Sequence, residues 1–154
     1  MSKKIRLPIT GLFLLALVMS QVTLTAEDKK GVKFNDVHKQ TEEFIGYYHS
    51  IQLTAEQEKV KNDALSKIPA PCCSEFTQAT CCCPCNLAKS VWGLSNYLIV
   101  KQHYDANQVR ETALEWIHFI NKDGFDGNSC KTGRCPVPFN ESGCGGMNES
   151  HISY

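Results

Sequence analysis

Six cysteines lie within fourteen residues of this 154-residue chain, and several of them are direct neighbours. They are Cys72, Cys73, Cys81, Cys82, Cys83 and Cys85. Adjacent Cα atoms across a trans peptide stand about 3.8 Å apart, whereas a relaxed disulfide needs about 4.4 to 6.8 Å between Cα atoms. Neighbouring cysteines of the cluster are therefore poor disulfide partners for each other. Their sulfurs must act across the loop, through disulfides to more distant cysteines, binding of a soft metal ion, or redox chemistry.

Binding of a soft metal ion is the function that the cluster favours. Thiolates select Cu(I), Zn(II) or iron–sulfur clusters. The C-x-x-C spacing of Cys82 and Cys85 places two thiolates on one ion, and two further cysteines would complete a tetrahedral zinc site. Cu(I) would need fewer ligands. The first-choice ligands are Cys72, Cys73, Cys82 and Cys85, with Cys81 and Cys83 as alternates.

The enzymatic alternative is a dithiol oxidoreductase, because Cys82-Cys83-Pro84-Cys85 resembles the active-site turn of thioredoxin-like proteins. Cys82 would attack a substrate disulfide and Cys85 would resolve the mixed disulfide. Pro84 stands at or near the first turn of a predicted helix, whose positive end lowers the pKa of nearby thiols. We therefore expect lowered thiol pKa values at Cys82, Cys83 and Cys85. A thioredoxin-like fold also needs a βαβ unit, for which residues 74–80 are a weak strand candidate.

A third hypothesis is a disulfide-stapled domain without chemistry. Cys72 and Cys73 would bridge to two of the later four cysteines of the cluster, each bridge contributing about 2 to 4 kcal/mol. Two of Cys130, Cys135 and Cys144 would bridge to each other or to the cluster. Since the chain has nine cysteines, at least one thiol would stay outside such intramolecular pairs.

The three later cysteines also suggest a secondary metal site. Cys144 stands just before Gly145, Gly146 and Met147, so a thiolate and a thioether suited to Cu(I) lie close together in the sequence. The alternative is that the methionine only fills apolar space and that the glycines form a loop. The candidate secondary ligands are Cys130, Cys135, Cys144 and Met147.

The N-terminus has the layout of a secretory signal, with a basic start, an apolar run over 7–19 and a polar stretch over 20–26. We predict removal after Ala26 and an extracytoplasmic protein, either periplasmic or secreted. An uncleaved membrane anchor is the alternative. Sixteen basic residues balance sixteen acidic ones, so no basic face for nucleic acid is indicated. The expected partners are a metal ion and a redox or metal-transfer protein.

Apolar residues at three- and four-residue spacing predict a mainly α-helical single domain. The helix after the cluster is apolar around most of its circumference and should form the buried centre, and Gly93 in its middle indicates close approach of a neighbouring helix. The predicted helices cover 34–49, 55–67, 86–100 and about 105–122. The domain thus spans 27–122, with an irregular cysteine-rich loop over 69–85 and an irregular Gly/Pro/Cys tail over 123–154.

The order of these features resembles that of exported bacterial PCYCGC-motif proteins. The resemblance rests on Pro71-Cys72-Cys73 and Cys81-Cys82-Cys83-Pro84-Cys85 ahead of a helical region, and it covers about residues 69–121. It implies an exported, cysteine-dependent, mainly helical bacterial protein. No residue role is carried across, because the cysteines of that family are separated by Tyr and Gly.

Overall fold

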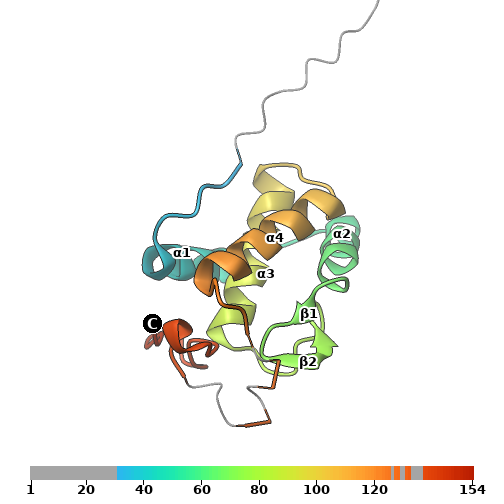
Figure 1. Ribbon diagram of the computed structural model, residues 1–154. Coiled ribbons are helices and arrows are strands. Elements are labelled where there is room, and N and C mark those ends of the chain that lie inside the picture. The colour runs from blue at the N-terminus through green and yellow to red at the C-terminus, as the bar shows by residue number, and fades with distance from the viewer. Residues whose placement is uncertain (1–30, 126, 129–130, 133–136) are drawn as a thin grey trace, which may run out of the picture.

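A computed structural model describes residues 31–125, 127–128, 131–132 and 137–154, and four α-helices account for about half of them (Figure 1). The elements are α1 (Val37–Ser50), α2 (Ala55–Leu65), β1 (Pro69–Ala70), β2 (Cys73–Thr77), α3 (Asn86–Lys101), α4 (Ala106–Ile120) and the 3-10 helix η1 (Phe139–Glu141). The predicted mainly α class is confirmed, with a cysteine-rich segment between α2 and α3. The predicted signal segment lies outside the described residues. Within the described part of the chain, no helix is long and apolar enough to cross a membrane.

Local hydrogen bonds fix where three of the helices begin. The backbone N–H of Gln57 donates to Thr54 Oγ1 at 3.3 Å, and the backbone N–H of Thr54 donates to Gln57 Oε1 at 2.9 Å. This is the capping box that the sequence predicts for α2. Asp105 and Gln108 form a second capping box at α4, and Asp36 accepts from the backbone of α1. The start of α3 is different, because its N-cap residue Cys85 makes no side-chain capping hydrogen bond.

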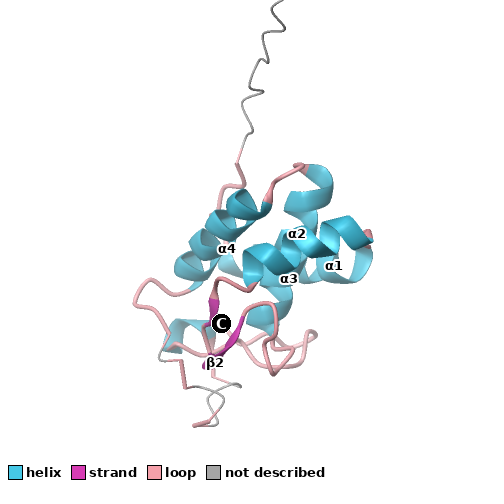
Figure 2. Cartoon of the chain, turned by 90° about the vertical axis from the view of Figure 1, so that its right-hand side faces the viewer, coloured by secondary structure: helices cyan, strands magenta, loops and turns pink. Residues whose placement is uncertain are grey.

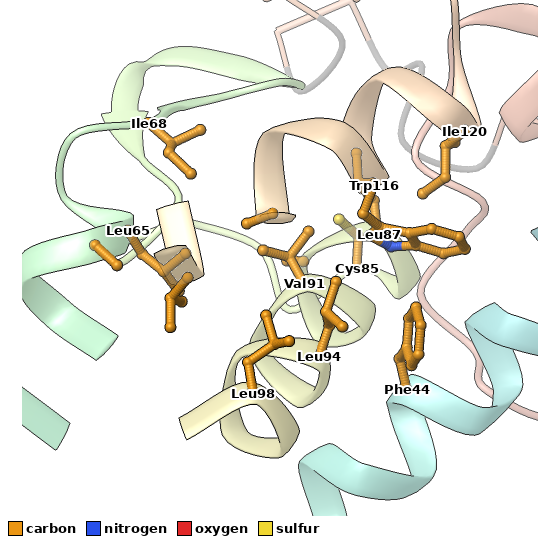
Figure 3. Packing of buried hydrophobic residues seen from close by; sticks show 14 of the residues in the cluster. Phe44, Leu65, Ile68, Cys85, Leu87, Val91, Leu94, Leu98, Trp116 and Ile120 are labelled. Atoms are coloured by element: carbon orange, nitrogen blue, oxygen red, sulfur yellow. The ribbon is translucent and has the colours of Figure 1, made fainter. Parts of the chain in front are cut away.

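The helix α3 lies at the centre of the core, as predicted. Leu87, Val91, Leu94 and Leu98 are at most 1% exposed (Figure 3). Burial of each such side chain stabilises the fold by roughly 1.5 to 3 kcal/mol. The fully buried Trp116 of α4 donates from its indole Nε1 to Ser90 Oγ of α3 at 3.0 Å. The helices thus form one half of the molecule, and the strands and most loops gather at the other end (Figure 2).

The crossing of α1 over α3 depends on Gly93. A Cβ atom added at Gly93 would collide with the backbone oxygen of Phe44 and would stand 2.7 Å from the backbone nitrogen of Tyr48. The predicted close approach of a neighbouring helix is therefore confirmed. Because both groups belong to the backbone of α1, a side chain at position 93 forces the two helices apart.

The structure differs from the expected irregular loop between α2 and α3. Two short antiparallel strands form a hairpin there, with Pro69 opposite Thr77 and Ala70 opposite Cys73. Period-two alternation does not reveal β2, because three consecutive residues after buried Cys73 are exposed. The hairpin is positioned by contacts outside the strand pair, such as the hydrogen bond from the backbone N–H of Gln78 to Ile68 O at 2.8 Å.

The C-terminal residues 137–154 pack against the helices. Phe139 of η1 is 1% exposed, and Cys144 is fully buried. Apart from η1, this segment is irregular, as the sequence predicts. Cys130 and Cys135 lie outside the described residues.

We predict that Gly93→Ala lowers the free energy of unfolding by at least about 2 to 3 kcal/mol, because α1 must move away from α3. The matched control is Gly46→Ala, at an exposed position of α1 where an added Cβ meets no atom within 4 Å. Gly46→Ala should raise stability by up to about 1 kcal/mol through helix propensity. Urea denaturation of both variants measures the two effects. Equal stability of the two variants would contradict the proposed role of Gly93.

Candidate thiolate site

The N-terminal end of α3 lies between the hairpin and the C-terminal segment (Figure 1). The backbone N–H of Asn86 donates to Gly146 O at 2.9 Å, and that of Leu87 donates to Cys144 O at 3.2 Å. The first N–H groups of a helix have no partner within the helix, so carbonyl groups of the C-terminal segment cap α3. Gly145 and Gly146 have φ values of +72° and +82°, a conformation that favours glycine. The turn next to Cys144 therefore depends on these glycines.

Side chains of α1 and α3 hold the same segment. Lys89 Nζ contacts Glu149 Oε1 at 2.6 Å and donates to Met147 O at 3.1 Å. His49 Nε2 contacts Glu149 Oε2 at 2.7 Å. The pKa of Glu149 is lowered, first by its hydrogen bond with Lys89 and then by that with His49. These contacts keep Cys144 next to the start of α3.

Four thiols from three segments meet at this point. The thiol of Cys72 contacts those of Cys81 and Cys85, and the thiol of Cys85 also contacts that of Cys144. Cys72, Cys85 and Cys144 are at most 1% exposed, and Cys81 is partly exposed. We call these four residues the inner group.

Hydrogen bonds inside the inner group shift the thiol pKa values in opposite directions. The contacts with Cys72 and then Cys85 lower the pKa of Cys81 to about 3. The pKa of Cys72 is raised, mainly by its hydrogen bond with Cys81, and that of Cys85 is raised, mainly by its hydrogen bond with Cys144. Neighbouring S–H groups thus stabilise a thiolate at Cys81. The Cys85 pKa is raised and not lowered as expected from the helix end, because the hydrogen bond with Cys144, the contact with Cys81 and burial all favour its neutral thiol.

Three further cysteines form a second group. Cys73 contacts Cys82, and the Sγ atoms of Cys82 and Cys83 are 3.5 Å apart. Cys73 is 4% exposed, Cys83 is partly exposed, and Cys82 is exposed to solvent. We call these three residues the outer group.

Two pairs of neighbouring cysteines are divided between the groups, whereas the neighbours Cys82 and Cys83 share the outer group. Cys72 is in the inner group and Cys73 in the outer group, and the same holds for Cys81 and Cys82. The contacts of Cys72 with Cys81 and of Cys73 with Cys82 run across the loop as expected, but Cys82 also contacts its neighbour Cys83.

The structure divides the predicted first-choice ligands between the two groups. Cys72 and Cys85 belong to the inner group, whereas Cys73 and Cys82 belong to the outer group. Of the alternates, Cys81 joins the inner group and Cys83 the outer group. Among the described cysteines there is no disulfide, and the described side chains include no cluster already arranged as metal ligands.

The sequence does not place Cys144 with the main cluster. It indicates a secondary site of Cys144 with Met147, but the Met147 side chain is 44% exposed while the Cys144 thiol contacts Cys85. The other predicted members, Cys130 and Cys135, lie outside the described residues. The adjacent Gly145 and Gly146 are the one local signal of a tight turn near Cys144.

The arrangement around Cys82 and Cys85 differs from a thioredoxin-like site. The two strands in the described part of the chain form an antiparallel hairpin, so the described residues contain no βαβ unit. Cys85 is fully buried and contacts the inner group, while Cys82 is exposed and contacts Cys73 and Cys83. The two sulfurs thus have different surroundings.

Comparison of the chain with protein families, with curated proteins and with solved structures gives no match. The resemblance to PCYCGC-motif proteins therefore stays a prediction.

We predict that Glu149→Gln loosens the C-terminal segment, because Lys89, whose side chain is only 11% exposed, loses its anionic partner. A carboxyl group with a lowered pKa in the folded state stabilises the protein above its ordinary pKa of 4.5 and loses this effect as the pH falls through the folded-state pKa. The difference in Tm between the protein and Glu149→Gln should thus be largest near about pH 7 and should narrow toward about pH 3.

The matched control is Glu141→Gln, an exposed carboxylate of the same segment that is in none of the ion pairs among the described residues. Its Tm should follow that of the unchanged protein at every pH. A difference for Glu149→Gln that is independent of pH would contradict the electrostatic role of Glu149.

Proposed function

We propose that this chain binds a soft metal ion, Cu(I) or Zn(II), through the thiolates of Cys72, Cys81, Cys85 and Cys144. The observation that carries the proposal is the meeting of four sulfurs from the hairpin, the start of α3 and the C-terminal segment. Four thiolates are a common ligand set for zinc. Cu(I) is also favoured by soft thiolates and is satisfied by fewer of them.

The chemistry of the donor set fits such an ion. Four sulfurs at a Zn–S distance of about 2.3 Å stand about 3.8 Å from each other in a tetrahedron. The inner thiols contact one another through hydrogen bonds, so they would have to move and lose their protons to accept a metal. The thiolate at Cys81 supplies one deprotonated ligand at the outset.

Burial of the inner group also supports a metal rather than an open catalytic site. Three of its four sulfurs belong to residues that are at most 1% exposed. A buried thiolate needs a positive charge or hydrogen bonds to offset the loss of water, and a metal ion supplies that charge. With an exported location, the protein would take part in handling copper or zinc outside the cytoplasm.

A dithiol oxidoreductase is the second candidate, and the stabilised thiolate at the partly exposed Cys81 favours it. In that case Cys81, rather than Cys82, attacks a substrate disulfide and forms a mixed disulfide. The Cys72 thiol, after losing its proton, attacks Cys81 and releases the second substrate thiol. The protein becomes oxidised by two electrons and the substrate becomes reduced.

We predict that the purified, reduced chain binds about one Zn(II), and that Cys72→Ser and Cys144→Ser each weaken this binding at least about 100-fold. The control is Met147→Leu, which removes an exposed thioether near Cys144 and should leave zinc binding unchanged. Native mass spectrometry gives the stoichiometry, and competition with a chromogenic chelator gives the affinity. Both cysteine variants should also lose the gain in Tm that zinc confers on the unchanged protein.

Retention of zinc affinity by both cysteine variants would contradict the inner group as the ligand set. Absence of bound metal together with rapid reduction of a disulfide peptide, lost in Cys81→Ser, would favour the oxidoreductase. Absence of both activities, with the thiols of the native protein resistant to alkylation before reduction, would favour the disulfide-stapled domain.

A further inference from the structure

The outer group is a second set of sulfurs with a different environment from the inner group. Cys82 lies between its two partners, in contact with Cys73 on one side and 3.5 Å from Cys83 on the other, measured between Sγ atoms. Cys82 is exposed, so an ion in water reaches this group directly. Of the inner group, by contrast, only Cys81 is not fully buried.

We propose that Cys73, Cys82 and Cys83 form a solvent-facing acceptor site for Cu(I), which passes the ion to the buried inner group. The binding step stands on the outer group alone, whereas the transfer step rests on the proposed function of the inner group.

The number and kind of donors select Cu(I) for this site. Three thiolates satisfy Cu(I), while a structural zinc site requires a fourth ligand. Glu75 of β2 is near Cys73, but its carboxylate is in an ion pair with Lys131, at 2.7 Å from Nζ to Oε1. The outer group thus offers a metal ion sulfur ligands, because the nearby carboxylate already has a cationic partner.

The pKa of the Cys73 thiol is raised, first by burial and then by its hydrogen bond with Cys82, so this thiol must lose its proton when it binds an ion. Two contacts act in the opposite direction. The backbone N–H of Glu75 donates a hydrogen bond to the Cys73 sulfur, and Lys131 adds a nearby positive charge. Amide groups directed at a sulfur and nearby cations both stabilise the anionic form. These contacts offset part of the negative charge that several thiolates on one Cu(I) would bring together.

Cysteines of the two groups are adjacent in the chain, so the ion would move only a short distance from one group to the other. Cys72 and Cys73 are neighbours, as are Cys81 and Cys82, so the Cα atoms that carry inner and outer sulfurs are about 3.8 Å apart. In each exchange an inner thiolate forms a Cu–S bond while an outer Cu–S bond breaks. The proton lost by the inner thiol goes to the released outer thiolate through water. Copper stays Cu(I), and no electron is transferred.

The test compares Cu(I) and Zn(II) binding by the reduced full chain under anaerobic conditions. We expect about two Cu(I) ions but about one Zn(II) ion per chain. In the double variant Cys82→Ser/Cys83→Ser, Cu(I) binding should fall by about one ion, and zinc stoichiometry and affinity should not change. Rapid mixing with a Cu(I)–chelator complex should also show copper uptake slowed at least about 10-fold, because the ion must then reach the buried sulfurs directly. Far-UV circular dichroism and Tm confirm that the variant is folded.

The matched control is Thr80→Ser, in the same turn, which keeps every thiol and the hydroxyl oxygen that accepts from the backbone N–H of Thr77. It should bind and take up Cu(I) like the unchanged protein. Unchanged copper stoichiometry in the double variant, with zinc bound by the inner group, would overturn the acceptor site and leave the proposed function intact. Loss of one copper ion in the double variant without any zinc binding by the unchanged protein would support the acceptor site and overturn the inner zinc site. A stoichiometric loss without slower uptake would overturn the transfer step.

Discussion

The first turn of α3 requires hydrogen-bond acceptors from outside the helix, and this requirement organises the rest of the site. The N–H groups of Asn86 and Leu87 find their partners in the C-terminal segment, and the side chain of Asn86 donates to Gly145 O at 2.8 Å. A buried N–H group left without a partner would cost roughly 1 to 3 kcal/mol. The segment that supplies these carbonyls contains Cys144. Capping of the central helix therefore brings a distant thiol to Cys85.

The second constraint is the short distance between neighbouring cysteines. Cys72 and Cys73 contribute to different groups, and so do Cys81 and Cys82, whereas Cys82 and Cys83 share one group. The adjacent cysteines thus contribute to two groups of sulfurs, of which the inner group is mostly buried and the outer group includes the exposed Cys82. Under the proposed function, this division would separate a stable ligand set from an exchangeable one.

The helices were predictable from the sequence because their signals are local. The capping box of Thr54 and Gln57 and the apolar faces of α1, α3 and α4 lie within short windows of residues, and Gly93 in α3 indicated the close approach of α1. The hairpin was not predictable, since β2 lacks alternating burial.

The composition of the inner group could not be predicted, because it depends on contacts between residues far apart in the chain. Cys144 joins Cys85 through the backbone hydrogen bonds that cap α3, and no periodicity in the sequence encodes such a contact. The thiol pKa values follow from the same contacts. The dipole of α3 alone predicts a lowered pKa at Cys85, whereas the neighbouring buried thiols raise it and place the thiolate at Cys81.

A metal in the inner group would link three parts of the chain that the apolar core holds unequally. The start of α3 is anchored by buried leucines, whereas the C-terminal segment is held by the buried Phe139 and by polar contacts, among them those of Glu149 with Lys89 and His49. When ligands come from separate segments, the free energy of metal binding also stabilises their association. The gain in stability on metal binding would therefore be greatest for the C-terminal segment, since α3 is already held by its packing. Metal occupancy and docking of residues 137–154 would then be thermodynamically coupled, each favouring the other by the same factor.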